Sequence, residues 1–106
     1  MARRAYYTGA SSIHGKGVFA GRDFVEGDLI GVFEGEETGE DGEHVLWIDD
    51  EESGRIYGLR GTNDLRFVNH SSRPNAEFDG ERLIALSAIH TDEEITFHYG
   101  DAWNDV

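Results

Sequence analysis

Two short stretches of this 106-residue chain combine hydrogen-bonding side chains with turn signals. The first runs from Arg66 to Ala76 with the sequence RFVNHSSRPNA, and the second from Glu94 to Gly100 with the sequence EITFHYG. In the first stretch an apolar pair leads directly into Asn-His-Ser, and the Pro-Asn that follows prevents a strand or helix from continuing. Asn, His and Tyr side chains presented at such breaks can hydrogen-bond a ligand, although Asn and Ser are also ordinary turn formers. Alone, Asn-His-Ser fits a capped turn as well as it fits a binding site.

The histidines make a metal site the competing interpretation. His44, His70, His90 and His98 could combine with nearby carboxylates. However, no two histidines have the His-x-x-x-His spacing that places both imidazoles on one helix face of a zinc protease. The chain also has no cysteine to supply a thiolate ligand. The sequence therefore predicts no metal centre.

Length and composition indicate a single small domain. A chain of 106 residues has room for one modest hydrophobic core. No run approaches the roughly 18 apolar residues of a membrane span, and the two arginines near the start have no apolar stretch behind them, unlike those of a signal peptide. Since cysteine is also absent, we expect no membrane association and an intracellular location. That location is the cytoplasm, or the nucleus or a host cell if the protein is eukaryotic or viral.

The acidity of the chain bears on its partners. The formal net charge is −13. Direct nucleic-acid binding is not expected, because phosphate contacts need clustered Lys and Arg, whereas a basic partner is favoured. Residues 34–52 contain ten acidic residues and no Lys or Arg. This run is interpreted as a solvated face or as the border of an entrance for a cationic peptide, and solubility or a salty cytoplasm explains the acidity equally well.

The elements that must position these residues are expected to be short strands. No stretch keeps a helical period over ten residues, and turn signals recur every eight to twelve residues, so the fold class is predicted to be mainly β. Strands are expected over residues 4–12 (at a sheet edge), 18–20, 29–33, 44–48, 76–78, 82–86 and 95–99. Asp79-Gly80 indicates a tight hairpin turn. Residues 23–33 are interpreted as strand, turn and strand, and residues 55–65 as a loop or a single helical turn.

Three motifs in a fixed order resemble the SET-domain protein-lysine methyltransferases. Arg66 to Ala76 is similar to the family pattern R-F-x-N-H-S-C-x-P-N, Glu94 to Gly100 is similar to E-[IL]-T-x-x-Y-G, and residues 13–20 are similar to the N-terminal G-x-G. The resemblance covers roughly residues 10–103. It implies one SET domain over residues 1–106, without pre-SET or zinc-binding post-SET regions, built of several small curved sheets with a C-terminal pseudoknot. Because knots are rare, folding rules alone would not predict that threading.

The resemblance also implies roles for individual residues. It implies in-line transfer of a methyl group from S-adenosylmethionine to a protein lysine in a narrow channel, where desolvation favours the neutral amine. The Tyr99 hydroxyl is the implied catalytic group, and the implied substrate channel is lined by His44, Phe97 and Tyr99. The implied cofactor-binding residues are Lys16, Gly17, Val18, Arg66, Asn69, His70, Tyr99 and Trp103. Trp103 could instead be a hydrophobic plug that closes the core.

Several positions depart from the family pattern. Ser72 stands where many members have a zinc-binding cysteine, His98 replaces the usual aspartate before the tyrosine, and Asp92 stands where glycine is common. Phe33 and His44 stand where members often have tyrosine. Without the zinc cluster, a partner subunit, as in a homodimer, or the substrate is expected to complete the channel wall. The expected substrate is a basic, lysine-containing protein or peptide. Two alternatives stay open: a catalytically degenerate SET domain that binds cofactor or protein, and an acidic interaction domain for a basic partner.

Overall fold

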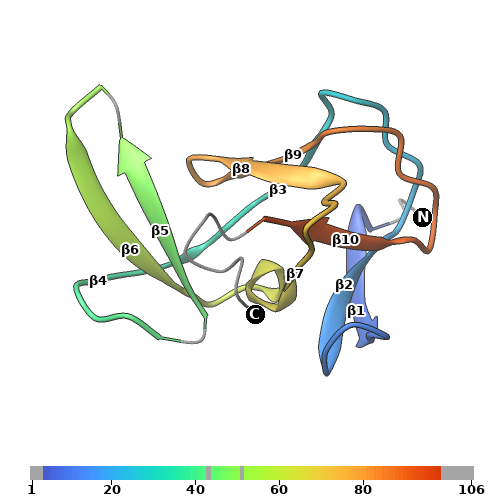
Figure 1. The fold of residues 1–106 in the computed structure, drawn as a ribbon, viewed down its shortest axis with the longest axis horizontal. Coiled ribbons are helices and arrows are strands. Elements are labelled where there is room, and N and C mark those ends of the chain that lie inside the picture. Colours follow the sequence, from blue (N-terminus) through green and yellow to red (C-terminus); the bar gives the residue numbers. More distant parts are fainter. Residues whose placement is uncertain (1–3, 43, 51, 99–106) are drawn as a thin grey trace.

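The fold is mainly β, as predicted, and the residues that the structure describes form three small sheets (Figure 1). The structure is a computed structural model that describes residues 4–42, 44–50 and 52–98. The strands are β1 (Tyr6–Ala10), β2 (Lys16–Ala20), β3 (Leu29–Val32), β4 (Gly35–Thr38), β5 (Val45–Asp50), β6 (Arg55–Gly61), β7 (Asn69–His70), β8 (Ala76–Asp79), β9 (Arg82–Ala85) and β10 (Glu94–Phe97). One short 3₁₀ helix, η1 (Asp64–Phe67), precedes β7.

The first sheet has the order β1-β2-β10-β7. Strand β1 forms its predicted edge and pairs antiparallel with β2, whereas β10 pairs antiparallel with β2 and parallel with β7. In the parallel pair, Thr96 lies opposite Asn69 and Phe97 lies opposite His70. The motif that contains Asn69-His70 and the motif that begins at Glu94 are therefore adjacent in space. The pseudoknot stays a prediction, because the segment after His98 lies outside the described residues.

The second sheet, of order β3-β9-β8, contains the predicted hairpin. Strands β8 and β9 pair from Ala76 opposite Ala85 to Asp79 opposite Arg82. The turn between them needs a left-handed backbone at Gly80, whose φ is 62°, and glycine adopts that conformation without steric cost. The Asp-Gly signal was therefore sufficient to locate this hairpin.

The third sheet, of order β4-β6-β5, corrects one prediction. Residues 55–61, expected to be a loop or helical turn, form its central strand β6, and only Asp64–Phe67 is helical. Glycine weakens a strand by itself, but Gly58 has a packing reason. A Cβ there would lie 3.0 Å from Val45 Cγ1 and 3.2 Å from Trp47 Cη2 on the neighbouring strand. The acidic segment Gly35–Thr38 is also a strand, which its charge concealed.

Two residues outside the named strands add detail to the sequence interpretation. Phe24, predicted within a strand, makes only an isolated bridge with Ile89, so residues 23–33 contain one strand, β3, rather than two. Asp92, where the family often has glycine, has a φ of 72°. This left-handed region is one that Asp tolerates better than most residues.

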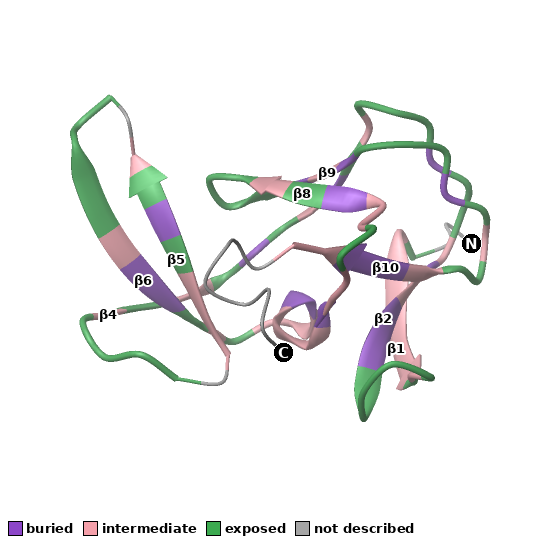
Figure 2. Ribbon diagram, viewed as in Figure 1, coloured by how far each residue is buried: buried purple, intermediate pink, exposed green. Residues whose placement is uncertain are grey.

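The buried apolar residues of the core come from all three sheets, from η1 and from the connecting loops (Figure 2). Leu65 of η1, Val18 of β2 and Ile95 of β10 are almost fully buried within it. The other buried apolar residues are Ala20, Phe24, Ile30, Phe33, Ile48, Leu59, Val68, Ala76, Leu83, Ala85 and Ile89. This core fixes β10 between β2 and β7. In the described residues, no helix is long and apolar enough to span a bilayer.

Candidate functional site

The side-chain amide of Asn69 is the centre of the site. Asn69 is 8% exposed on β7. Its Nδ2 atom lies 3.0 Å from the backbone oxygen of His14 and 3.2 Å from that of Lys16. The same atom lies 3.1 Å from Ser11 Oγ and 3.0 Å from Glu94 Oε2. Two N–H donors shared among four acceptors hold the glycine-containing loop between β1 and β2 against β7.

Ser11 and Glu94 complete this network, and the sequence analysis did not identify either as a site residue. The Ser11 hydroxyl donates to the Glu94 carboxylate, with both oxygens 2.8 Å away. It also accepts a hydrogen bond from the backbone N–H of Ile13 at 2.9 Å. Glu94 offered one usable signal. It is a charged residue at the start of a strand that otherwise runs into the core, and such a residue needs a polar partner.

Gly17 shows how closely this network is packed. A Cβ atom on Gly17 would lie 2.5 Å from Glu94 Oε2 and 3.0 Å from Ser11 Cβ. A larger residue at position 17 would therefore displace the Glu94 carboxylate, which Ser11 and Asn69 hold in place by hydrogen bonds. Gly15 differs, because it has a φ of 43° and no atom within 4 Å of an added Cβ. Gly15 allows the left-handed backbone of the turn, whereas Gly17 leaves room for the Glu94 side chain.

A second amide fixes the other edge of β10. Asn75 Oδ1 accepts from the backbone N–H of Thr96 at 2.9 Å, and Asn75 Nδ2 donates to the backbone oxygen of Glu94 at 2.9 Å. The backbone N–H of Ser71 donates to the oxygen of Phe97 at 3.0 Å. The Pro-Asn segment thus continues the pairing that β7 begins. Together these bonds fix the position of the strand that leads to Tyr99.

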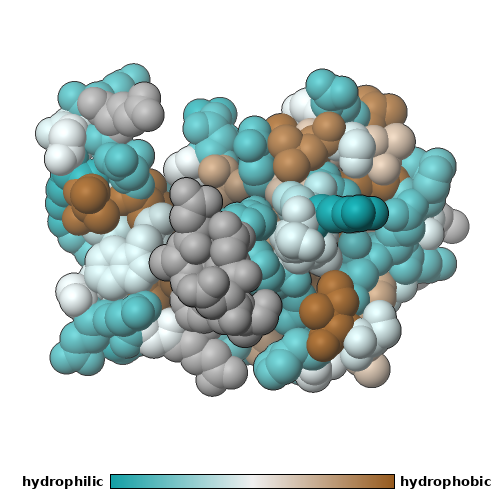
Figure 3. Space-filling view, viewed as in Figure 1, coloured by the Kyte–Doolittle hydropathy of each residue, from teal (hydrophilic) through white to brown (hydrophobic). Residues whose placement is uncertain are grey.

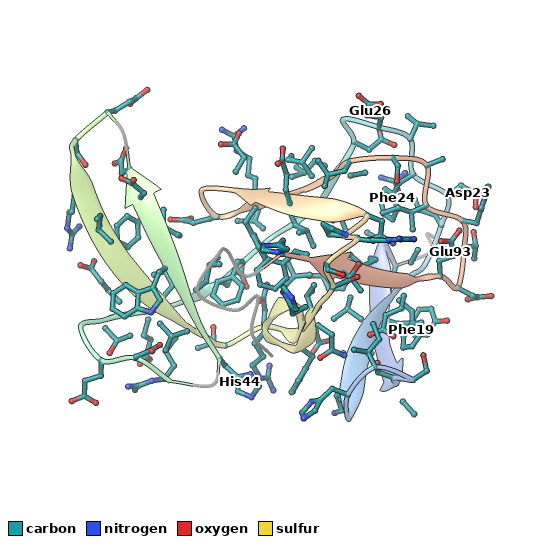
Figure 4. All side chains as sticks on the ribbon, in the orientation of Figure 1. Phe19, Asp23, Phe24, Glu26, His44 and Glu93 are labelled. Carbon is teal, nitrogen blue, oxygen red and sulfur yellow. The ribbon has the colours of Figure 1, made fainter. Side chains whose placement is uncertain are left out.

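Cationic side chains gather around the ring of Phe67. The Lys16 ammonium lies 4.8 Å from the ring centroid and the Arg66 guanidinium lies 4.2 Å from it. The His44 ring meets the same ring edge-on at 5.4 Å, and its Nδ1 is 3.1 Å from the backbone oxygen of Arg66. Figure 4 shows His44 at the end of the β5–β6 hairpin nearest η1. Phe67, which the sequence analysis did not single out, thereby joins three predicted site residues.

The imidazoles of His70 and His98 are in contact. Their centroids are 4.8 Å apart, with the planes inclined at 62°. Burial, and then the charge of His98, lower the pKa of His70. Because two adjacent cations repel each other, a charge on His98 disfavours protonation of His70. His98 thus places a titratable group one residue before Tyr99, where the family pattern has an aspartate.

Three aromatic rings form a row that runs from β10 toward the third sheet. The ring of Phe97 meets that of Phe78 edge-on at 4.8 Å, and Phe78 meets Phe33 edge-on at 5.8 Å. Phe97 and Phe78 are partly buried against the core. The predicted channel residue Phe97 therefore lies against an apolar aromatic row, whereas His44 lies on the side of the cationic cluster.

The predicted site residues are only partly brought together among the described residues. The structure gathers Lys16, Gly17, Arg66, Asn69 and His70 around β7 and the loop before β2. The side chain of Val18 is buried in the core, and its pairing partners are Thr8 and Ile95, so the cofactor contact that the resemblance implies for Val18 would be made by its backbone and stays a prediction. Tyr99 and Trp103 lie outside the described residues, and their roles stay predictions. The described residues contain no group of three or more His, Asp or Glu suited to a metal ion.

The sequence as a whole places the chain in a family. A sequence model of the SET domain matches residues 15–100, which is most of the chain. The protein therefore belongs to the SET-domain family, a methyltransferase family. A search of curated protein sequences gives no match.

Solved structures share the fold. The chain is similar to a Plasmodium falciparum protein described as a candidate histone methyltransferase, with a TM-score of 0.71 and 23% identity over 96% of this chain and 98% of that one. It is also similar to a chain of the Chaetomium thermophilum Polycomb Repressive Complex 2 bound to S-adenosylmethionine, with a TM-score of 0.73 and 25% identity. That match covers 94% of this chain and 16% of the other. A humanised mutant of the same complex bound to an inhibitor gives a TM-score of 0.73, 24% identity, and 94% and 15% coverage.

Proposed function

We propose that this protein transfers a methyl group from S-adenosylmethionine to a lysine side chain of a protein. The observation that carries the proposal is the Asn69 network. A buried amide joins the glycine loop before β2 to the carboxylate of β10 and the hydroxyl of Ser11. It thereby ties together the three segments that carry the family motifs. Positioning of this kind supplies much of the rate in group-transfer reactions.

The residues around β7 fit the charges of this cofactor. Every hydrogen bond that the Asn69 side chain makes with another described residue uses Nδ2. Its Oδ1 atom is therefore left to accept from the ammonium group of the amino-acid end. The cations of Lys16 and Arg66, which share the ring of Phe67, would face the carboxylate of that end. The backbone of His70, the next residue on β7, would add contacts to the same cofactor.

The chemistry requires a neutral amine next to an electrophilic methyl group. When bound, the cofactor supplies that methyl group on a sulfonium. A free lysine has a pKa of about 10.4, so the protein must favour loss of the proton. The aromatic row of Phe97, Phe78 and Phe33 offers a desolvating environment on one side of β10, and desolvation disfavours the charged amine. The hydroxyl of Tyr99, which follows the same strand, would orient the nitrogen.

Two measurements test the proposal. Isothermal titration with S-adenosylmethionine should give saturable one-to-one binding. Incubation with methyl-labelled cofactor and a mixture of basic peptides should then label the peptides, and amino-acid analysis should find the label on lysine. The same mixture with its lysine amines acetylated is the matched control and should stay unlabelled. Binding without transfer would favour the degenerate SET domain, and the absence of any binding would refute the proposal.

A further inference from the structure

The outer face of the second sheet carries exposed aliphatic side chains. Along β9, Leu83 and Ala85 are buried and face the core. Ile84 alternates with them and points to the other face, as does Leu86, which is 38% exposed and whose backbone N–H still pairs with the segment before β8. Leu29 of β3 lies directly opposite Ile84 in the ladder and is 47% exposed, so it is on the same face. Three neighbouring aliphatic residues therefore face away from the core.

This apolar surface extends to both ends of β3. Val32, which lies opposite Arg82 of β9, is on the same outer face, and Val25 belongs to the turn that leads into β3 and is 63% exposed. Of the seven large hydrophobic residues that are exposed in the described part of the chain, four belong to this face or its entrance. The space-filling view shows hydrophobic surface gathered over β9 and the segment before β3 (Figure 3). Because contiguous apolar surface, unlike scattered single residues, marks an interaction site, we treat these residues as one outer patch, namely Val25, Leu29, Val32, Ile84 and Leu86.

The pairing of β9 decides which kind of partner the outer patch can hold. Both edges of β9 are paired, with β3 on one side and β8 on the other. The face of the sheet therefore offers side chains, and no backbone N–H or C=O group, to a partner. A polypeptide that crosses this face must satisfy its own backbone hydrogen bonds, and an α-helix does so within one segment. A helix packed on a sheet face is also a stable layer arrangement.

Carboxylates border the outer patch. Glu77 of β8 lies directly opposite Ile84 and shares its face, and Figure 4 shows Glu26 at the top of the molecule, on the turn beside Val25. Glu26 and Glu77 make no hydrogen bond or ion pair with another described residue. The basic residue Arg82 lies at the hairpin end of the face. Basic side chains that flank an apolar stripe would complement the carboxylates of Glu26 and Glu77.

The same charges argue against other occupants. In a symmetric dimer a patch meets itself, so a second copy would bring Glu26 and Glu77 toward the same acidic groups. The net charge of −13 adds to that repulsion. An anionic membrane surface would be repelled in the same way.

We propose that the outer patch binds an amphipathic helix of another protein. The apolar stripe of this helix covers the outer patch, and basic residues beside the stripe contact Glu26 and Glu77. Phe78, the residue after Glu77, packs on the inner side of the same sheet. The helix and the aromatic row that we assign to the target lysine therefore lie on opposite faces. The inference goes beyond the proposed function and does not depend on it.

A synthetic amphipathic helix tests the outer patch. The probe is a fluorescently labelled peptide of leucine and arginine, with the leucines spaced to form one helix face and with no lysine to be methylated. Fluorescence anisotropy at physiological salt should show saturable one-to-one binding, and circular dichroism should show a gain of helix on mixing. A control peptide of the same composition, in an order that gives no apolar helix face, should bind about fivefold more weakly or less. Equal binding of the two peptides would mean general attraction to an acidic protein and would overturn the inference.

Two pairs of aliphatic substitutions locate the binding on the protein. Leu29→Thr with Leu86→Thr should weaken binding about fivefold or more, because apolar area is lost from the interface while threonine still suits a strand. The matched control, Ile13→Thr with Ile56→Thr, changes two isoleucines that are exposed outside the second sheet and should bind within about twofold of the unaltered protein. Equal weakening in the two double variants would refute the assignment to this face.

Two pairs of charge substitutions test the acidic border. Glu26→Gln with Glu77→Gln should weaken binding about threefold. Glu36→Gln with Glu40→Gln removes the same charge from β4 and the loop after it and should change binding by less than about twofold. If both pairs have the same effect, the charge dependence belongs to the net charge of the protein, and the proposed contacts of Glu26 and Glu77 are wrong.

A variant that should gain affinity guards against loss of folding. Arg82→Leu extends the apolar row of β9 and removes a cation from the face, so binding should strengthen about threefold or more, which a damaged fold would not produce. Light scattering of the unaltered protein tests the rival occupant. A dimer that Leu29→Thr with Leu86→Thr dissociates would assign the outer patch to a second copy and overturn the inference, as would the absence of peptide binding.

Discussion

Replacing Asn69 with alanine tests the centre of the site most directly. The change removes two buried N–H donors and leaves the backbone oxygens of His14 and Lys16 without the partner they share. A buried hydrogen bond contributes about 0.5–1.5 kcal/mol, and one to a charged group such as Glu94 about 1.5–3 kcal/mol. We therefore expect the free energy of unfolding to fall by about 2–4 kcal/mol. For a domain of this size, that corresponds to a melting temperature lower by roughly 10 °C or more.

Asn69→Ala should also weaken cofactor binding. Because Oδ1 is lost together with Nδ2, affinity for S-adenosylmethionine should fall by about tenfold or more, the effect of losing one charge-assisted hydrogen bond. Thermal denaturation and isothermal titration measure the two effects on one preparation.

Asn63→Ala is the matched control for this pair of measurements. Asn63 Nδ2 donates to the Val32 backbone oxygen at 2.9 Å, and its Oδ1 accepts from the Glu34 N–H at 3.3 Å. It therefore has a structural role before η1, in hydrogen bonds that are more exposed than those of Asn69. Asn63→Ala should lower stability while leaving cofactor affinity within about twofold. If Asn69→Ala lowers stability but leaves affinity unchanged, Asn69 is a structural residue only and our assignment of Oδ1 is refuted.

Three further outcomes are expected. Tyr99→Phe should lower turnover while cofactor affinity stays within a few-fold, and unchanged turnover would remove Tyr99 from catalysis. Because the folded state holds the pKa of His70 low, the unfolded chain binds the extra proton first, so stability should fall as pH drops below about 6.5. His98→Asn should reduce this loss in thermal melts between pH 8 and 5, though burial keeps part of it, and an identical pH profile would contradict the His–His coupling. Gly17→Ala should lower stability by about 1–3 kcal/mol, because its Cβ would clash with Glu94, and a melting temperature equal to that of the unaltered protein would contradict the packing.

Local signals in the sequence identified the elements whose conformation is decided locally. The Asp-Gly turn gave the β8–β9 hairpin, and the glycines around Lys16 gave the turn before β2. Strand β6 was missed because its glycine at position 58 weakens strand propensity, whereas the contact that requires glycine is made by Trp47 and Val45 on another strand. A pattern within one segment carries no information about such a neighbour. Tertiary packing decided this element.

The candidate site was predictable in its residue types but not in its connections. The motifs identified Asn69 and the glycine loop, yet the amide joins the loop to a carboxylate 25 residues away and to a hydroxyl 58 residues away. Glu94 and Ser11 fell within or beside the recognised motifs and were still not identified. Their role depends on β10 lying parallel to β7, and parallel pairing leaves no local turn signal that a sequence could reveal.

The arrangement of this network makes formation of the site depend on the position of β10 in the first sheet. Ser11 follows β1, Asn69 is on β7 and Glu94 begins β10, so the four-way contact forms only when β10 lies between β2 and β7. Loop-closure entropy for contacts this distant in sequence must be overcome before any of the bonds forms. The shape of the glycine loop and the docking of β10 are then one cooperative event. A ligand that binds the loop should therefore stabilise the whole first sheet, and variants in this network should lose stability and affinity together, whereas Asn63→Ala should lose stability alone.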